Sequence, residues 1–377
     1  MFFSVKLSET DFGGKNMKII DCHYHNRFWF DGDKNFLDVQ KEYRKRNGLD
    51  TINVLCAPGN ENGSPNGGVG HNCLAAILKL EDSKVYAQAG LQYPFPGDDE
   101  ASEEFDFKKQ AEKLRAMGFD GMKMMESKPT TYKKIKYRID SDKYKEFFAY
   151  LEETQFPLIW HVADPEEFWD DPDKVSQNAK DHGWFYGDGT YPTYDQVYKE
   201  VYTILERHPK IKVILCHCFF ISAHPQQMID LLEKYENVYI DLTPGPEMYR
   251  DFSNNREVWM DIFNKYYKRF MIGTDVNTGC SDYIRDRLIG DIVRFFSTDD
   301  EYTGFEFYGE EYRYNLKGFK LDDEKCEYIF GKSMLEMFGH EPYKINTKLF
   351  KEYVEENSHR IPDDKTRNEI VKYTQNI

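Results

Sequence analysis

The chain has 377 residues, of which 40% are apolar and 16% aromatic, a composition typical of one large globular body with an extensive core. Its 50 lysines and arginines against 66 aspartates and glutamates give a net charge of −16, which argues against nucleic acid and anionic membranes as partners, because both require a basic surface. No stretch approaches the roughly 20 apolar residues of a membrane-spanning helix. Residues 1–14 also lack the basic and apolar regions of a secretion signal, so we expect a cytoplasmic protein.

The cysteines favour a reducing compartment. There are seven, an odd number, and no two form a C-x-x-C motif. Cys22, Cys216 and Cys218 lie inside or beside apolar, strand-like segments, where a thiol packs as a small hydrophobic group. We expect reduced, structural cysteines.

Short apolar segments alternate with amphipathic segments along the chain. Because the apolar segments are nearly continuous, they predict parallel strands that are buried on both faces. The predicted strands are 17–23, 51–57, 85–92, 119–125, 156–162, 212–217, 237–243 and 269–275. Apolar residues spaced three and four apart predict helices at 36–48, 72–82, 107–118, 144–154, 194–209, 225–236 and 258–268, several of which stop at Gly, Asn or Pro.

This order of elements predicts an α/β fold, a (β/α)₈ TIM barrel. A doubly wound open sheet also alternates strands and helices. The barrel is favoured because closure places the first and eighth strands side by side, so that polar residues at the ends of distant strands converge.

The barrel is expected to carry three additions. Residues 164–193 form a long aromatic and acidic loop after the fifth strand, and residues 276–330 form a second one after the eighth. In a barrel, both loops lie over the catalytic mouth as lids or specificity walls. We assign residues 1–340 to the barrel and 341–377 to a helical extension packed on its outside.

Five polar residues stand where predicted strands end. His23 and His25 close the first strand, His161 the fifth, His217 the sixth, and Asp275 the eighth. Imidazole nitrogens and carboxylate oxygens are suitable ligands for a divalent ion such as zinc, and residues two apart on an extended chain project to the same side. One metal-centred enzyme site accounts for all five residues.

In this order, the motifs resemble those of the amidohydrolase superfamily. The resemblance covers roughly residues 17–340 and is closest to the amidohydrolase 2 group, which also contains metal-dependent decarboxylases. Its elements are the His-x-His of the first strand, His161, the HCFF of 217–220, HPQQMIDLLEKYENVYIDLTPG at 224–245, the GTD that ends at Asp275, and IFGKSMLEMFG at 329–339.

The resemblance implies a role for each of these residues. One divalent ion, zinc first and manganese second, would be held by His23, His25, His161 and Asp275. Asp275 would also be the general acid and base. His217 would stand just outside the ligand shell and polarise a substrate carbonyl or stabilise negative charge.

Two cationic residues are weaker candidates for substrate binding. Lys123 ends the fourth strand, where some members of the superfamily have a carboxylated lysine that bridges two metals; a salt bridge to Glu126 and a cation that orients an anionic substrate are the alternatives. Arg27 follows His25 by two residues and could bind a substrate carboxylate. His224 opens the next helix and is expected to lie outside the metal shell.

Aromatic residues are frequent around the fifth strand and the loop that follows it. They either wall an aromatic pocket or pack the loop against the barrel, and the second alternative is favoured. They are Trp160, Trp169, Trp184, Phe185 and Tyr186.

We therefore expect a metal-dependent hydrolase that acts on a C–O or C–N bond of a small, carboxylated, soluble substrate. A non-oxidative decarboxylase with the same site is the alternative, since fold does not decide chemistry. A catalytically silent barrel that binds metal is a third possibility. The expected partner is a small-molecule substrate, and a homo-oligomer is compatible with the sequence.

Overall fold

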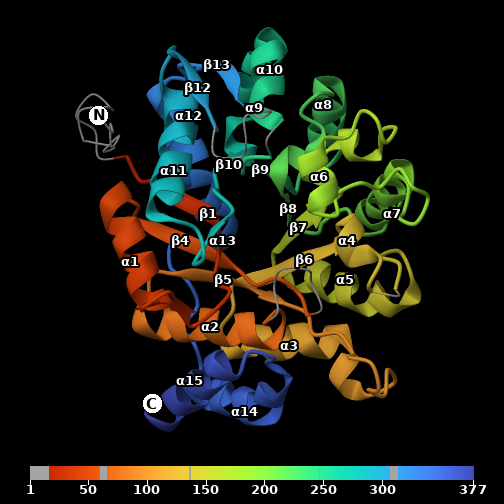
Figure 1. Ribbon diagram of the computed structural model, residues 1–377, viewed down its shortest axis with the longest axis vertical. Coiled ribbons are helices and arrows are strands. Elements are labelled where there is room, and N and C mark those ends of the chain that lie inside the picture. The colour runs from red at the N-terminus through yellow and green to blue at the C-terminus, as the bar shows by residue number, and fades with distance from the viewer. Residues whose placement is uncertain (1–16, 60–65, 136, 246, 306–312) are drawn as a thin grey trace.

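A single parallel sheet forms the centre of the computed structural model, which describes residues 17–59, 66–135, 137–245, 247–305 and 313–377. Within these residues the sheet has the strand order β10-β9-β8-β7-β6-β5-β4-β1-β11 (Figure 1). Its strands are β1 (Ile20–His25), β4 (Thr51–Leu55), β5 (Tyr86–Gly90), β6 (Gly121–Ser127), β7 (Leu158–Val162), β8 (Val213–Leu215), β9 (Val238–Asp241), β10 (Phe270–Met271) and β11 (Val276–Asn277). Each of these strands lies inside a predicted strand or extends at most two residues beyond it.

The segment 270–277 joins the two ends of this sheet. Its first part, β10, pairs with β9, and its last part, β11, pairs with β1. Between them the backbone N–H of Cys22 donates to the carbonyl of Ile272 at 3.0 Å. The sheet therefore curls until its last segment reaches its first strand, as in a TIM-like α/β fold and unlike an open doubly wound sheet.

Helices cover the outer face of the sheet (Figure 1). The longer ones are α1 (Phe36–Asn47), α2 (Val69–Glu81), α3 (Phe107–Met117), α5 (Asp142–Thr154), α7 (Tyr194–Arg207), α8 (Pro225–Lys234), α10 (Arg256–Tyr266) and α11 (Asp282–Ser297). Their ends follow from local sequence: the Asp106 side chain caps α3 by accepting from the N–H of Lys109, and Gly118 ends this helix in the left-handed conformation.

Shorter elements complete the described chain. They are β2 (Phe30–Asp31), β3 (Lys34–Asn35), η2 (Glu103–Phe105), α4 (Pro129–Tyr132), η3 (Glu166–Trp169), α6 (Gln177–Asp181), η4 (His217–Phe220), α9 (Met248–Asn254), η5 (Tyr267–Arg269), β12 (Glu301–Gly304), β13 (Tyr314–Lys317), α12 (Asp323–Glu327), η8 (Tyr328–Lys332), α13 (Ser333–Phe338), α14 (Thr347–Asn357), η9 (Ser358–Arg360) and α15 (Asp364–Gln375).

Two apolar cores lie on the two faces of the sheet. The larger core fills the space between the strands and the outer helices. A smaller core lies inside the curl and takes alternate residues of the strands, because successive side chains of a strand point to opposite faces. It includes Ile20, Cys22, Leu55, Tyr86, Ile159, Ile214, Cys216 and Met271, with Met334 and Met337 from α13. The seven cysteines, all within the described residues, are free thiols, as predicted.

The segment 164–193 has a small core of its own. Phe168, Val175, Ala179 and Tyr186 are buried against one another. Trp169, Trp184, Phe185 and Tyr191 pack against this cluster. The aromatic residues of the loop therefore pack mainly on one another, whereas the favoured alternative expected them to pack the loop against the barrel; Trp169 also packs against the main core. Trp160 is separate from them, because it points from β7 toward Phe148 of α5, with 5.5 Å between ring centroids.

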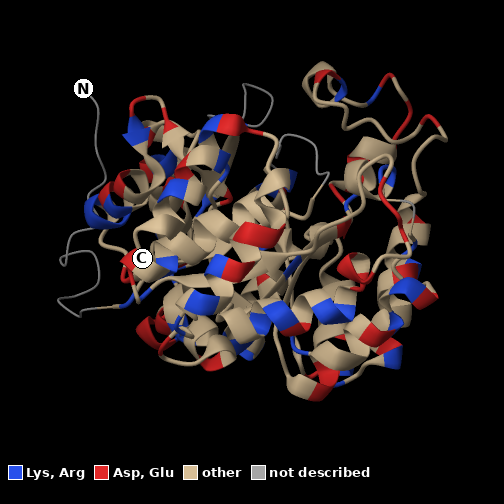
Figure 2. Cartoon of the chain, turned by 90° about the horizontal axis from the view of Figure 1, so that it is seen from below, with Lys and Arg blue, Asp and Glu red and all other residues tan. Residues whose placement is uncertain are grey.

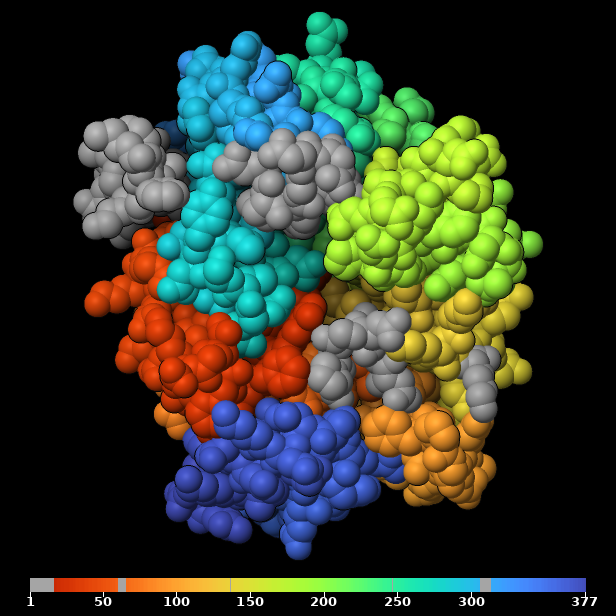
Figure 3. Space-filling model, in the orientation of Figure 1, coloured from red at the N-terminus to blue at the C-terminus, as the bar shows by residue number. Residues whose placement is uncertain are grey.

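The segment after the eighth strand is more regular than a loop. It contains α11, which packs beside α1, the antiparallel pair β12 and β13, and α12; residues 306–312 of the predicted excursion lie outside the described residues. Figure 3 shows α11 in cyan and the segment 164–193 in yellow-green on opposite sides of a depression in this face.

The last two helices, α14 and α15, lie against α2 and α3 at one end of the molecule (Figure 1). Asn72 of α2 donates to the hydroxyl of Tyr353 at 3.2 Å, and Tyr373 donates to Glu81 at 2.6 Å. Charged residues of both signs are interspersed over the outer helices (Figure 2). Among the described residues, no helix combines the length and the apolarity needed to span a bilayer.

Candidate functional site

Four histidine rings and one carboxylate meet where β1, β7, β8 and the segment 270–277 end. The ring centroids of His23 and His25 are 5.1 Å apart, those of His23 and His217 5.1 Å, and those of His217 and His161 4.7 Å. Oδ1 of Asp275 lies 3.1 Å from Nε2 of His25 and 3.6 Å from Nε2 of His23. The structure thus brings together all five residues that the strand ends predicted.

Buried acceptors fix the orientation of His23 and His25. Nδ1 of His23 lies 2.6 Å from a carboxylate oxygen of Asp241, and Nδ1 of His25 lies 2.7 Å from the carbonyl oxygen of Leu55. Both partners accept hydrogen bonds, so each Nδ1 carries the proton and each Nε2 faces Asp275.

His161 is held by a different set of groups. Its Nε2 lies 3.0 Å from the carbonyl of Ala163 and 3.2 Å from Asp164, both acceptors, which leaves Nδ1 with the lone pair. Asp164 is in turn held by Lys128 at 2.7 Å and by the hydroxyl of Tyr186 at 2.6 Å. The segment 164–193 therefore reaches the site through Tyr186.

His217 presents an unpartnered nitrogen. Its Nδ1 lies 3.3 Å from the carbonyl of Thr243, and its Nε2 is buried with no hydrogen-bond partner among the described residues. Because burial and the neighbouring His161 and His23 hold the pKa of His217 well below its usual value, the ring is neutral. A neutral ring with its proton on Nδ1 offers a lone pair at Nε2, which can accept a hydrogen bond.

The backbone is strained at this site. Asp275 has φ of 59° and His217 has φ of 55°, and non-glycine residues rarely adopt this left-handed region. Gly273 precedes Asp275, and a Cβ at this position would lie 2.5 Å from Cβ of His23 and 2.4 Å from Oγ1 of Thr243. The glycine of the GTD motif therefore allows the last strand to approach β1 closely.

Asp21 anchors the chain segment that precedes Asp275. Asp21 accepts hydrogen bonds from the backbone N–H of Thr274 at 3.0 Å, from its hydroxyl at 2.6 Å, and from Tyr43 at 2.9 Å. These bonds fix Thr274, the residue that precedes Asp275. The side chain of Asp275 is 41% exposed and can reach a substrate.

Three of these side chains match the donor set of a metal ion. Ligand atoms of His23, His25 and Asp275 all lie within 4.8 Å of one another. His25 is neutral because burial lowers its pKa to about 4, so its Nε2 lone pair faces the carboxylate of Asp275 without a proton between them. Two acceptors facing each other repel, and a cation between them removes the repulsion. His161 and His217 lie beside this group.

Without a cation, protonation of His23 places a positive charge beside the carboxylate of Asp275. Burial and the charge of Lys123 lower the pKa of His23, but Asp241 outweighs them and raises it to about 10. Burial raises the pKa of Asp275, but the neighbouring imidazoles of His25 and His23 hold it well below its usual value. A divalent ion would take the place of that proton.

The two candidate substrate cations lie in different places. Lys123 is fully buried and points to Sγ of Cys216 at 3.2 Å, whereas Glu126 accepts from the hydroxyl of Tyr93 at 2.6 Å. Cys216 itself forms a second group of convergent ligand atoms with His23 and Asp241. Lys123 therefore lies inside the curl of the sheet rather than at its rim.

Arg27 lies just beyond β1. Its backbone N–H donates to Thr278 at 3.3 Å, and its carbonyl accepts from Asn66 at 3.0 Å. Burial lowers the pKa of the nearby His71, and the charges of His25 and Arg27 lower it further. Among the described residues, neither ring nitrogen of His71 has a hydrogen-bond partner. His224, as expected, is apart from the histidine group and pairs with Glu166 at 2.7 Å.

Sequence reasoning missed the acceptors that orient the histidines. Asp241 ends β9 in the segment VYID, and Asp164 follows β7 by two residues. Both could have been found by the criterion that selected Asp275, a carboxylate where a predicted parallel strand ends. The carbonyls of Leu55 and Thr243 had no such signal, because every residue has a carbonyl.

Comparisons with known proteins identify a family. A family model described as Amidohydrolase matches residues 20–276, more than half of the chain. A search of curated proteins finds no match.

Solved structures share the fold at low identity. A 2,6-dihydroxybenzoate decarboxylase from Rhizobium is 13% identical with a TM-score of 0.51, and the match covers 85% of this chain and 98% of that one. The same kind of decarboxylase in complex with 2,6-dihydroxybenzoate has a TM-score of 0.52 at 13% identity, over 85% and 99% of the two chains. A putative amidohydrolase from Staphylococcus aureus is 16% identical with a TM-score of 0.51, over 86% and 100%.

Proposed function

The chain belongs to the amidohydrolase family, whose members are metal-dependent enzymes, and on that premise we propose that it is a metal-dependent hydrolase of a small soluble substrate. The observation that supports this most directly is the convergence of ligand atoms from His23, His25 and Asp275. His25 has no proton on the nitrogen that faces Asp275, so this nitrogen is available to a metal ion. His161 would complete the ligand set through Nδ1, the nitrogen that Asp164 and Ala163 leave unprotonated. Zinc is the first choice and manganese the second.

When bound, such an ion would supply Lewis acidity, which lowers the pKa of water and polarises a substrate oxygen. Asp275 has one oxygen near the histidines and a partly exposed side chain, so it can accept a proton and deliver it to a leaving group. His217 has a lone pair at Nε2 and can accept a second hydrogen bond from water or substrate. These two residues form the acid and base pair of the proposed mechanism.

A cation near the site would orient a carboxylated substrate. We propose Arg27 for this role, because it lies two residues beyond His25 and its backbone is fixed to Thr278 and Asn66. Lys123 remains a weaker candidate: its ammonium lies beneath His23, so its charge would act on the ligand histidine and, through it, on the substrate.

Non-oxidative decarboxylation is the second candidate. The observation in its favour is that two of the similar structures are described as decarboxylases. The same residues suit both reactions, because Asp275 could protonate the carbon that loses CO₂.

Product analysis separates the two reactions. Metal-loaded enzyme is incubated in ¹⁸O-labelled water with a panel of lactones, small amides and aromatic or unsaturated carboxylic acids, and CO₂ release is followed together with ¹⁸O in the organic product. Hydrolysis places solvent oxygen in the product, which is the result we expect. Release of CO₂ with no label in the organic product would replace hydrolase by decarboxylase, and turnover of neither kind in any metal-loaded sample would favour the silent barrel.

A further inference from the structure

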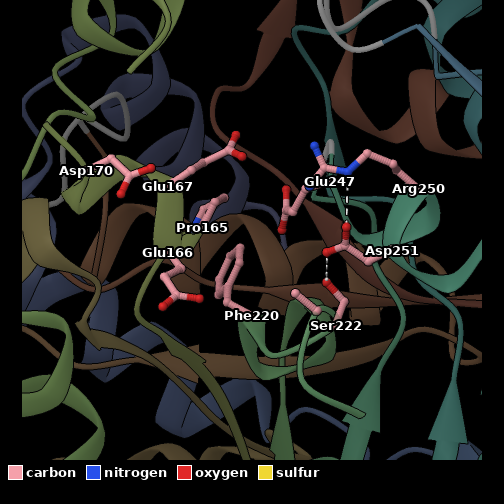
Figure 4. Close-up of a pocket in the computed structure, with 10 residues that line it drawn as sticks. Pro165, Glu166, Glu167, Asp170, Phe220, Ser222, Glu247, Arg250 and Asp251 are labelled. Carbon is pink, nitrogen blue, oxygen red and sulfur yellow. Dashed lines mark hydrogen bonds and ion pairs between the residues drawn. The ribbon is translucent and has the colours of Figure 1, made fainter. Parts of the chain in front are cut away.

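An acidic pocket of about 230 Å³ lies beside the histidine rings. It is lined by five carboxylate residues, one arginine and the ring of Phe220 (Figure 4). The carboxylates come from η3 and the residue that follows it, and from α9 and the residue that precedes it. They are Glu166, Glu167, Asp170, Glu247 and Asp251.

Two of these carboxylates have side-chain partners. Asp251 accepts from Nε of Arg250 at 3.0 Å and from the hydroxyl of Ser222 at 2.8 Å, as the dashed lines in Figure 4 show. Glu166 pairs with His224 at 2.7 Å. Among the described residues, Glu167 and Asp170 have no cation within ion-pairing distance, so the pocket keeps a surplus of negative charge.

Glu247 is the residue that points to a ligand. It is only 7% exposed, and its Oε2 has no hydrogen-bond partner among the described residues. Figure 4 shows Glu247 and Glu167 extending toward each other from opposite sides of the pocket. A buried carboxylate oxygen without a donor is costly, and a ligand that brings a charged donor removes that cost.

The pocket shares one wall with the proposed catalytic group. The ring of Phe220 lines the pocket and stacks on His217, with 5.1 Å between centroids, and it lies 5.4 Å from His161. A molecule whose reacting group contacts His217 can therefore extend past Phe220 toward Glu247. This places the pocket where the distal part of a substrate would lie.

We propose that this pocket binds an alkylammonium group of the substrate, held between Glu247 and Glu167 against the face of Phe220. The inference rests on the proposed function, because it describes a part of the substrate away from the reacting bond. An ammonium has three donors for separated carboxylates, and the face of an aromatic ring attracts a cation. The substrate would then carry a basic amine at one end and the group to be cleaved at the other.

The same geometry disfavours an inorganic cation. A metal ion requires several ligand atoms converging on one point, and the groups of described residues that converge within 4.8 Å contain no carboxylate of this pocket. The carboxylates are instead spread around a space that is large enough for an organic group.

The experiment is a binding titration with n-butylammonium chloride, 1-butanol and sodium butyrate by isothermal titration calorimetry, on metal-loaded protein. We expect saturable binding of butylammonium alone. Glu247→Gln and Glu167→Gln should each weaken it about tenfold or more, because each loses a charge-assisted hydrogen bond. Glu257→Gln is the matched control, since it removes an exposed carboxylate from α10, outside the pocket, and should change the affinity less than twofold.

The titration is repeated on the His23→Ala, His25→Ala double variant, so that the pocket is tested apart from the metal site. Equal binding to this variant supports the pocket whatever becomes of the proposed function. The proposal is overturned if 1-butanol binds as well as butylammonium, if butylammonium does not bind, or if Glu247→Gln leaves its affinity unchanged. It is also overturned if Ca²⁺ or Mg²⁺ binds there more tightly than butylammonium and displaces it.

Discussion

The imidazole of His23 and the carboxylate of Asp241 form a buried pair, with 2.6 Å between Nδ1 and Oδ2 and about 1% exposure for each side chain. Burial raises the pKa of Asp241, but the charge and hydrogen bond of His23 outweigh it and lower this pKa to about 2. The carboxylate therefore stays ionised and fixes the proton of His23 on Nδ1. Nε2 is kept available for a metal ion, so Asp241 acts on the metal through the histidine.

Asp241→Asn should weaken metal binding about 10- to 100-fold, because the amide orients the ring less strongly and makes Nε2 less basic. Competition with a chelating dye measures this affinity. Asp120→Asn is the matched control: it also removes a buried carboxylate, one paired with Lys79, which should reduce stability without changing metal affinity. Equal metal affinity in Asp241→Asn and the wild type would exclude this role for Asp241.

His23→Ala combined with His25→Ala should remove the bound metal. The two substitutions delete two of the three converging ligand residues, so the content should fall from close to one ion per chain to near zero. Elemental analysis after gel filtration gives the ratio, and circular dichroism checks that the double variant is folded. Undiminished metal in a folded double variant would show that the ion binds elsewhere.

Asp275→Asn should remove turnover while the fold persists. The amide has the shape of the carboxylate but cannot accept a proton, and loss of a positioned acid or base costs about 10²- to 10⁴-fold in rate. The rate at saturating substrate and at fixed metal occupancy is the relevant measurement. If the variant keeps most of the wild-type rate, Asp275 serves as a ligand only.

The sequence predicted the strands, the longer helices other than α11 and the convergence of five polar residues, because all of these depend on periodicity and on the geometry of parallel strands. The α-helix that begins at Asp282 was missed, although its Ser281 cap and its apolar spacing were visible, because the segment was assigned as a whole to a loop. The aromatic residues of segment 164–193 were expected to pack the loop against the barrel, but most of them form a small core within the loop, and nothing in the composition indicated that Tyr186 would hold Asp164.

The acidic pocket was beyond sequence reasoning. Glu167 and Glu247 are 80 positions apart, and neither stands in a recognisable motif; only the fold places η3 opposite the start of α9. Glutamates on a chain of net charge −16 are more often solvated than buried, so their number carried no signal. The burial of Oε2 of Glu247 without a partner depends on how distant segments pack, so the sequence alone does not indicate it.

Glu247→Gln should make the protein more stable at alkaline pH. Burial raises the pKa of Glu247 to about 8, with Glu167 and Asp251 raising it further and Arg250 opposing them. Because the folded state holds this proton more tightly than the unfolded chain, the contribution of Glu247 to stability is fully present below pH 4.5 and is lost as pH rises through about 8. Glutamine does not titrate, so its advantage over glutamate should grow across this interval and then level off.

Chemical denaturation at pH 4.5, 6, 7.5 and 9 measures this difference in the free energy of unfolding. We expect a gain of about 2 to 5 kcal/mol for Glu247→Gln at pH 9 relative to pH 4.5, from 1.36 kcal/mol per pKa unit allowing for relaxation of the folded state. Glu257→Gln removes an exposed carboxylate and should follow the wild-type profile. Butylammonium at saturation should reduce the gain, because a bound cation stabilises the ionised carboxylate in the folded protein only. Parallel profiles for Glu247→Gln and the wild type would mean that the carboxylate is solvated, and the pocket would then lack the unpartnered group on which its cation specificity depends.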